Sequence, residues 1–223
     1  LTSLLLAISA LIPLGIDTAC FVVAIVLAVM LPAQAGRAHL EARAAEKREP
    51  WFQQLASGFR FIVSKRMLVG LWLISTFTGI AFQAATASFV LFITVKAGLP
   101  AVYFGVFMLT GAVGAIAGSL VVPVLRRRLS NGILMASGNL VSALALVFVG
   151  LVPTVWGAAI GFTITSFSVT IWNVLVISLR QSIIPARLLG RVHGTWRTLL
   201  WGAMPIGSLL GGLLALIDLA VAF

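Results

Sequence analysis

Five side chains that could bind a small molecule lie within long apolar stretches of this chain. A polar group inside a membrane segment is costly, so it usually faces other helices or a water-filled cavity. Arg197 and Trp201 are four residues apart and therefore share one face of a helix. The set indicates a cavity for an amphipathic substrate that tolerates aromatic groups. Its members are Gln83, Trp172, Asn173, Arg197 and Trp201.

Each of these polar residues also has a purely structural interpretation. Amides inside a membrane can form hydrogen bonds between helices, and an arginine can extend its charged head to the cytoplasmic interface. We favour interhelical hydrogen bonding for Asn139. For Gln83, Asn173 and Arg197, both the cavity and the structural interpretation stay open.

The sequence lacks the residue patterns of an enzyme. The two histidines, His39 and His193, lie at or near basic segments, and no His-Glu-x-x-His pattern occurs. There is no glycine-rich phosphate loop followed by Lys-Ser or Lys-Thr, and no apolar stretch holds a pair of carboxylates. We therefore expect no catalytic residues, no metal site and no cofactor, and we predict that the protein is not an enzyme.

The composition indicates which elements position the candidate residues. Apolar residues make up 61% of the chain and charged residues 9%, and the mean hydropathy is +1.16. A soluble domain carries about 25% charged residues, so we exclude a large soluble core. The single cysteine, Cys20, excludes an internal disulfide framework. The sequence predicts an all-α, polytopic transmembrane helical bundle in a lipid bilayer.

The basic residues fall in clusters that alternate with weakly charged loops. Of the 15 lysines and arginines, all except Lys96 lie in the segments 37–66, 126–128 and 180–197, and we expect a basic loop from Arg180 to Arg191. Basic residues in short loops stay on the cytoplasmic side, so the pattern predicts a multi-pass protein of the plasma (inner) membrane with cytoplasmic basic loops. The net charge is +10. We expect no nucleic-acid partner, because the charges lie at helix ends and not along one face of a soluble fold.

The apolar stretches predict six membrane spans after a short apolar stub at residues 1–12. We expect Pro13 and Gly15 to form a turn after the stub, and the last span to be broken near Gly202 and Pro205. The predicted spans are 16–31, 67–95, 101–125, 131–151, 155–179 and 192–215.

A short amphipathic helix is predicted at the end of the polar segment 34–66. Pro50 opens it, because proline is tolerated in a first helical turn. An amphipathic helix of this kind beside a membrane span usually lies in the interface. We favour a plain linker helix over a sensor. Its apolar residues recur at helical spacing and are Trp51, Phe52, Leu55, Phe59 and Ile62.

Glycines recur four residues apart in three of the predicted spans. Such spacing lets helix backbones approach closely, so we expect tight packing rather than a direct role in substrate binding. The pairs are Gly114 with Gly118, Gly157 with Gly161, and Gly207 with Gly211, and they are extended by Gly111 and Gly212.

Several stretches resemble a known family of transporters. Residues 189–197 read LGRVHGTWR, followed by WGAMPIG at 201–207 and LGGL at 210–213. These stretches resemble the loop and eleventh helix of the major facilitator superfamily, in the branch of bacterial enterobactin and macrolide exporters. Residues 52–67 resemble the end of that family's central loop, and residues 118–132 resemble its loop between helices eight and nine. The last region lacks the carboxylate that the family often has there, so the resemblance does not extend to a charge relay.

The resemblance implies a partial major facilitator superfamily fold. It places the end of helix five and helix six at residues 1–33, the central cytoplasmic loop with its amphipathic helix at 34–66, and helices seven to eleven of the C-terminal bundle at 67–223. Helix twelve and the N-terminal half of the same chain would be missing. The implied protein is a twelve-helix secondary exporter, which moves an amphipathic small molecule such as a drug or siderophore by proton antiport and alternating access. Asp17 and Asp218 lie near the outer ends of spans, so a coupling carboxylate is expected in the missing part.

Two other functions stay open on the sequence. The membrane domain of an ATP-driven exporter would need a nucleotide-binding domain or partner and longer cytoplasmic coupling helices. A non-transporting membrane scaffold or assembly factor would give no substrate-dependent proton flux. We also expect residues 1–223 alone to be unstable and inactive, because half of the helix contacts of a complete transporter would be missing.

Overall fold

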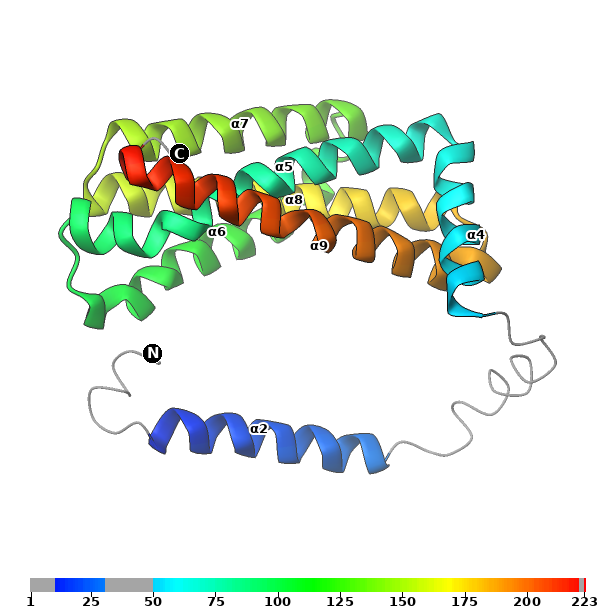
Figure 1. Cartoon of the computed structure of the whole chain (residues 1–223), viewed down its shortest axis with the longest axis horizontal. Helices are drawn as coiled ribbons and strands as arrows, with labels where there is room; N and C mark the ends of the chain where they lie inside the picture. Colours follow the sequence, from blue (N-terminus) through cyan, green and yellow to red (C-terminus); the bar gives the residue numbers. More distant parts are fainter. Residues whose placement is uncertain (1–10, 31–49, 221–222) are drawn as a thin grey trace.

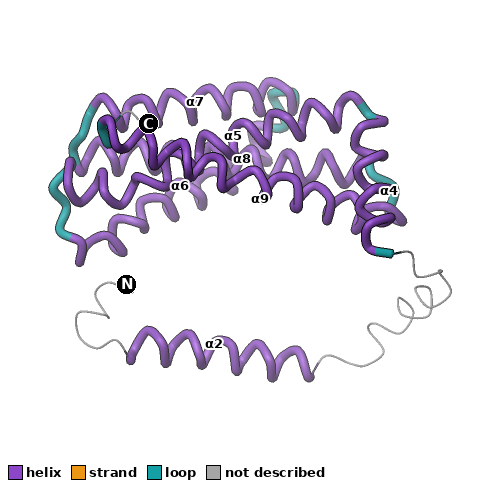
Figure 2. Tube along the Cα trace, in the orientation of Figure 1, coloured by secondary structure: helices purple, strands orange, loops and turns teal. Residues whose placement is uncertain are grey.

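From residue 50 to residue 220 the chain folds into helices joined by short connections (Figures 1 and 2). The computed structural model describes residues 11–30, 50–220 and 223, and over these residues the predicted all-α class is confirmed. A π-helical turn, η2 (Phe92–Lys96), and a 3-10 turn, η3 (Ala101–Tyr103), lie between α5 and α6. The α-helices are α2 (Leu11–Met30), α4 (Trp51–Ser64), α5 (Arg66–Leu91), α6 (Phe104–Leu125), α7 (Asn131–Leu151), α8 (Val155–Ile183) and α9 (Ala186–Ile217).

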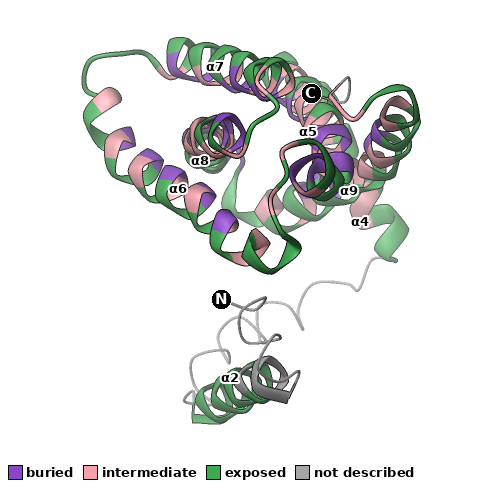
Figure 3. Cartoon of the chain, turned by 90° about the vertical axis from the view of Figure 1, so that its left-hand side faces the viewer, coloured by how far each residue is buried: buried purple, intermediate pink, exposed green. Residues whose placement is uncertain are grey.

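Five of the described helices are long and apolar enough to cross a membrane: α5 together with η2, then α6, α7, α8 and α9. Large apolar side chains such as Leu120 and Leu209, each 69% exposed, lie on their outer surfaces, where lipid would contact them. The apolar stretch Asp17–Met30 within α2 is shorter than these five helices and lies outside the group, although the sequence predicts a span at 16–31. The side chains described in α2 are exposed (Figure 3).

The long helices form two groups that meet at both ends of the bundle. α8 packs against both α6 and α7, and α9 packs along α5 and against α4 (Figure 1). One apolar cluster near α4 joins the groups and includes Leu68, Leu175 and Trp196. A second cluster, which includes Phe92 and Phe107, joins them at the opposite end.

Glycines set the distance between neighbouring helices. A Cβ atom at Gly118 of α6 would lie 2.7 Å from the carbonyl oxygen of Phe167 in α8. A Cβ atom at Gly211 of α9 would lie 2.7 Å from the Cα atom of Ala84 in α5. Real Cβ atoms essentially never come within 3.0 Å of another heavy atom, so only glycine fits at either position. The predicted tight packing is confirmed at both sites, whereas a Cβ at Gly212 would meet nothing within 4 Å.

Most of the described basic residues gather at the end of the bundle where α4 lies (Figure 1). α6 and α8 end there, and α5, α7 and α9 begin there, so the residues 126–128 and Arg187 share this end. Lys96 lies at the opposite end and bonds the carboxylate of Asp218. This bond, aided by one from the Ala220 backbone N–H, holds the pKa of the Asp218 carboxyl below its ordinary value. The charge separation follows the predicted pattern, and the cytoplasmic assignment of the basic end stays a prediction.

Two helix breaks predicted from proline and glycine are wrong. α9 continues from Ala186 to Ile217 without a break at Gly202 or Pro205. Pro205 removes a single backbone hydrogen bond, and glycine-mediated packing on α5 holds the helix on its C-terminal side. α2 likewise includes Pro13 and Gly15, which the sequence places in a turn. The helix continues through both residues, so neither of them forms the predicted turn.

The basic loop predicted from Arg180 to Arg191 is also wrong. α8 continues to Ile183 and α9 begins at Ala186, so the connection is only Ile184 and Pro185. Arg180 is therefore a helical residue in the last turn of α8, and Arg191 belongs to α9. Positive charge at a helix C-terminus is favourable, which lets α8 extend through an arginine that looked like a loop residue.

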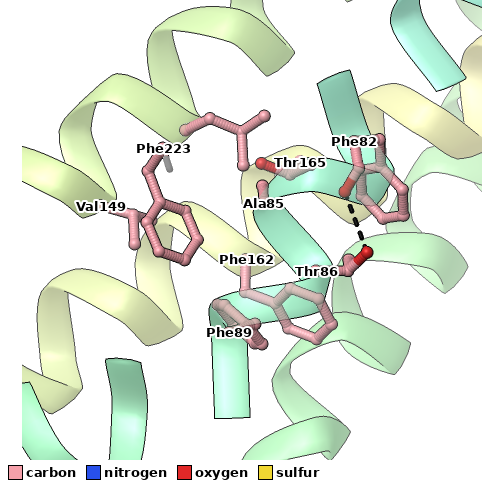
Figure 4. A pocket seen from close by; sticks show the side chains of 9 residues that line it. Phe82, Ala85, Thr86, Phe89, Val149, Phe162, Thr165 and Phe223 are labelled. Atoms are coloured by element: carbon pink, nitrogen blue, oxygen red, sulfur yellow. Dashed lines mark hydrogen bonds between the residues drawn. The ribbon is translucent and has the colours of Figure 1, made fainter. Parts of the chain in front are cut away.

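Aromatic rings of the second apolar cluster pack closely around Phe89, and Figure 4 shows part of this region. The rings of Phe89 and Phe162 have centroids 5.0 Å apart, and those of Phe89 and Phe223 are 5.9 Å apart. The Thr86 hydroxyl donates to the Phe82 carbonyl at 3.0 Å. The space left among these residues is about 10 Å³, the lower limit for a single water. This region is packed, and it leaves no room for a substrate.

Candidate functional site

A cavity of about 400 Å³ opens between the two groups of helices. α5 and α9 form one wall, and α7 and α8 form the other. Pockets that bind small molecules have volumes of roughly 300–1,000 Å³, so this cavity is large enough for a ligand. Its polar and aromatic lining includes Asn139, Trp172, Asn173, Arg180, Trp196 and Arg197.

One face of α8 lies along the cavity. Ser168, Trp172, Val176 and Arg180 follow one another at four-residue spacing, which puts them on the same side of the helix. Arg180 is only 8% exposed. Its guanidinium carbon lies 4.7 Å from the ring centroid of Trp196 on α9, in a cation–π contact.

One face of α9 lies opposite. His193, Arg197 and Trp201 are again four residues apart, and all three line the cavity. The Arg197 guanidinium carbon lies 4.6 Å from the Trp201 ring centroid, so the predicted shared face is confirmed. In contrast to Arg180, both of these residues are exposed. The cavity thus has two arginines, each stacked on a tryptophan.

α5 and α7 supply further polar groups. Ser75 on α5 is buried, and its Oγ has no hydrogen-bond partner. Ser142 and Asn139 line the cavity from α7. We predicted an interhelical hydrogen bond for Asn139, and within the part of the chain that the structure describes its amide makes none. The amide instead faces the cavity, where it can donate to and accept from a ligand.

The structure brings four of the five predicted residues together. Trp172, Asn173, Arg197 and Trp201 all line the cavity. Gln83 does not line it: its side-chain N–H group donates to Ser208 Oγ at 3.2 Å and joins α5 to α9. Sequence spacing alone could not separate these outcomes, because it does not show which helix packs against Gln83. Substrate binding by the four remains a prediction.

The sequence reasoning missed Arg180, which it placed in a loop. A signal was present, because Arg180 is eight residues after Trp172 and four after Val176, the spacing of one helix face. We gave more weight to the rule that arginines at the ends of apolar stretches belong to cytoplasmic loops, and therefore predicted a loop at Arg180. Pro185, five residues later, was the better marker of where the helix ends.

Comparison with known proteins gives the chain a family. A family model described as transmembrane secretion effector, of the major facilitator type, matches residues 1–222. The chain belongs to this family. It is therefore a multi-pass membrane transporter of the major facilitator type, in agreement with its five long apolar helices. Neither the curated proteins nor the solved structures gave a match.

The charge of this secretion effector's cavity is uniformly positive or neutral. No aspartate or glutamate occurs anywhere from residue 50 to residue 217, which covers every residue of the five long helices. Arg180 and Arg197 therefore have no carboxylate partner in these helices. In the described residues, no cluster of histidine, cysteine and carboxylate side chains could hold a metal ion.

Proposed function

We propose that this member of the transmembrane secretion effector family exports an amphipathic small molecule, such as a drug or siderophore, by alternating access. The observation that supports the proposal is the cavity of about 400 Å³, with aromatic and polar walls, inside a bundle of otherwise apolar helices. A packed scaffold has no need of such a cavity, because a void with polar walls is costly in a membrane.

The lining residues suit an amphipathic substrate. Trp172 and Trp201 offer ring faces to apolar or aromatic groups. Asn173 and Arg197 offer hydrogen-bond donors. Each of the two facing helices, α8 and α9, therefore offers both a ring face and a donor to a substrate in the cavity.

Proton antiport supplies the driving force in our proposal. The five long helices hold no carboxylate, so a coupling aspartate or glutamate would lie outside residues 50–217. We further propose that the basic end of the bundle faces the cytoplasm of a bacterial inner membrane, because basic segments are retained on that side. Alternating access would rock this bundle against a second, related bundle around the cavity.

The test is transport by the intact protein in inside-out membrane vesicles. Addition of an exported aromatic amphiphile should release protons from an acidified lumen, and an uncoupler should abolish uptake. Uptake that survives the uncoupler and requires ATP would instead favour an ATP-driven exporter. No substrate-dependent flux in any of these conditions, across anionic, neutral and cationic amphiphiles, would favour a non-transporting scaffold. Vesicles that lack the protein serve as the control.

A further inference from the structure

We propose that the cavity selects anionic amphiphiles, and that Arg180 is the residue that binds their carboxylate, sulfonate or phosphate group. The proposal names the substrate class of the site described above, so it rests on the proposed transport function for its biological meaning. The binding itself can be measured without transport.

Arg180 is a buried cation whose donors are left unpaired. The residue is 8% exposed, and its Nε and Nη1 atoms have no hydrogen-bond partner. Leaving a buried donor unsatisfied costs about 1–3 kcal/mol, and more for a charged group. A ligand that supplies the missing acceptor would remove this cost. Arg180 lines the cavity in which such a ligand would lie.

The bundle offers Arg180 no internal counter-ion. The chain has no aspartate or glutamate from residue 50 to residue 217. The guanidinium stacks on the ring of Trp196, which can stabilise a cation through its face but cannot accept the directed N–H bonds at the guanidinium edge. A bound anion satisfies both the charge and those edge donors, because carboxylate and phosphate match the guanidinium fork.

The cavity repeats this arrangement on α9. Arg197 stacks on Trp201 as Arg180 stacks on Trp196, and His193 lies one turn before Arg197. Stacking fixes the plane of each guanidinium and leaves its edge available. The two guanidiniums make the cavity attractive to anions and unattractive to cations, since like charges inside a low-dielectric site repel strongly.

The remaining lining provides for the apolar part of the same ligand. Trp172 and Val176 lie on the α8 face that ends in Arg180, and Phe82 faces them from α5. Ser75, whose buried Oγ is unpaired, lies on α5 as a further donor. An acid group carried on an aromatic ring system therefore meets a donor set at one end and ring faces at the other.

A simpler explanation of Arg180 is that it neutralises the C-terminal end of the α8 dipole. Arg180 is in the last turn of α8, where a cation is favourable by about 0.3–1 kcal/mol. An exposed side chain would give the same benefit with its donors in water. The dipole therefore explains why an arginine is tolerated there and does not explain why it is buried with unpaired donors.

Equilibrium binding of a matched pair of probes tests the proposal. We would titrate the intact protein, in lipid nanodiscs, with 2-naphthoate and with 2-naphthamide, which share a ring system and differ in charge; empty nanodiscs correct for partitioning into lipid. A charged hydrogen bond predicts that wild type binds naphthoate about 10-fold or more tightly than naphthamide.

Arg180→Gln should remove most of this preference. Arg187→Gln, the same change at an exposed arginine outside the cavity, should keep it. Equal binding of both probes by wild type, or a preference unchanged in Arg180→Gln, would overturn the proposal.

A second variant separates a ligand-binding role from a structural one. Arg180→Met keeps a contact with Trp196 through the thioether, and it removes the unpaired charge. If Arg180 binds ligand, ligand-free Arg180→Met should melt at or above the wild-type temperature and lose the stabilisation that naphthoate gives wild type. If Arg180 instead pairs with another part of the protein, the ligand-free variant should melt lower, because removing one partner of a buried pair is strongly destabilising. That lower melting temperature would refute the proposal.

The two proposals fail in different experiments. Selective naphthoate binding with no transport of any anion would leave the anion site standing and overturn the exporter. Uncoupler-sensitive export of cationic or neutral amphiphiles, without naphthoate selectivity in binding, would leave the exporter standing and overturn the anion site.

Discussion

Two adjacent glycines of α9 give a matched test of how the bundle packs. A Cβ atom at Gly211 would lie 2.7 Å from both the Cα and the carbonyl carbon of Ala84 in α5, whereas a Cβ at Gly212 would meet nothing within 4 Å. Ordinary van der Waals contact begins at 3.4 Å, so Gly211→Ala forces α9 and α5 several tenths of an ångström apart. Both atoms of Ala84 belong to the backbone, so no side-chain rotation relieves the overlap.

The magnitude follows from comparing the two alanine variants. Each gains about 0.8–1.0 kcal/mol of helix propensity over glycine, and this gain cancels in the comparison. Overpacking a well-packed region costs about 1–3 kcal/mol. We therefore expect Gly211→Ala to be less stable than Gly212→Ala by about 1–3 kcal/mol. For a domain of 150–250 residues, each kcal/mol shifts the melting temperature by about 2–4 °C.

Thermal unfolding of the intact protein in detergent measures this difference. Wild type, Gly211→Ala and Gly212→Ala would be purified identically and heated at one scan rate, because unfolding of membrane proteins is often irreversible. We expect Gly212→Ala to melt near or slightly above wild type and Gly211→Ala to melt several degrees below Gly212→Ala. Coincident melting of the two variants would refute the close approach of α9 and α5 at Gly211.

Three further predictions concern individual side chains. Arg197→Ala should lower efflux by the intact protein without preventing membrane insertion, because it removes a cavity donor at the helix surface; unchanged transport at matched expression would contradict this. Gln83→Leu and Ser208→Ala each remove the same hydrogen bond, so the double variant should lose less stability than the sum of the singles, by about 0.6 kcal/mol; strict additivity in melting experiments would count against the bond. The lowered pKa of Asp218 means that its bond with Lys96 stabilises the fold above the ordinary aspartate pKa, about 3.9, and that this stabilisation is lost as pH falls through the lowered value. The melting difference between wild type and Asp218→Asn should therefore be present at neutral pH and narrow steadily below about pH 4, and a constant difference would argue against the pairing.

The helical class and most helix ends could be predicted from the sequence because apolar length and basic ends are strong local signals. The spans at 101–125 and 131–151 are α6 with η3 and α7 as the structure has them. Boundaries marked by proline were less predictable, because a membrane helix tolerates Pro205 when its neighbours pack closely. Local signals cannot show which helix lies opposite, and the predicted break in α9 failed for that reason.

In the candidate site, too, contacts within one helix could be predicted from the sequence and contacts between helices could not. Four-residue spacing was enough to put Arg197 and Trp201 on one face. It could not show that Gln83 meets Ser208, which is 125 residues away along the chain, or that Arg180 turns inward onto Trp196. These partners depend on the packing of α9, and no pattern within α5 or α8 encodes it.

The long separation between α5 and α9 has a consequence for how the protein is made. At about 5–20 residues per second, Ser208 leaves the ribosome roughly 6–25 s after Gln83, its partner across the helix pair. The contact between α6 and α8 spans only 53 residues, from Thr110 to Thr163, and can form in less than half that time. α6, α7 and α8 can therefore assemble before α9 is made, while the Gln83 side chain of α5 still lacks its partner Ser208. The arrival of α9 would both satisfy that amide and close the cavity, which makes the cavity the last part of the bundle to form.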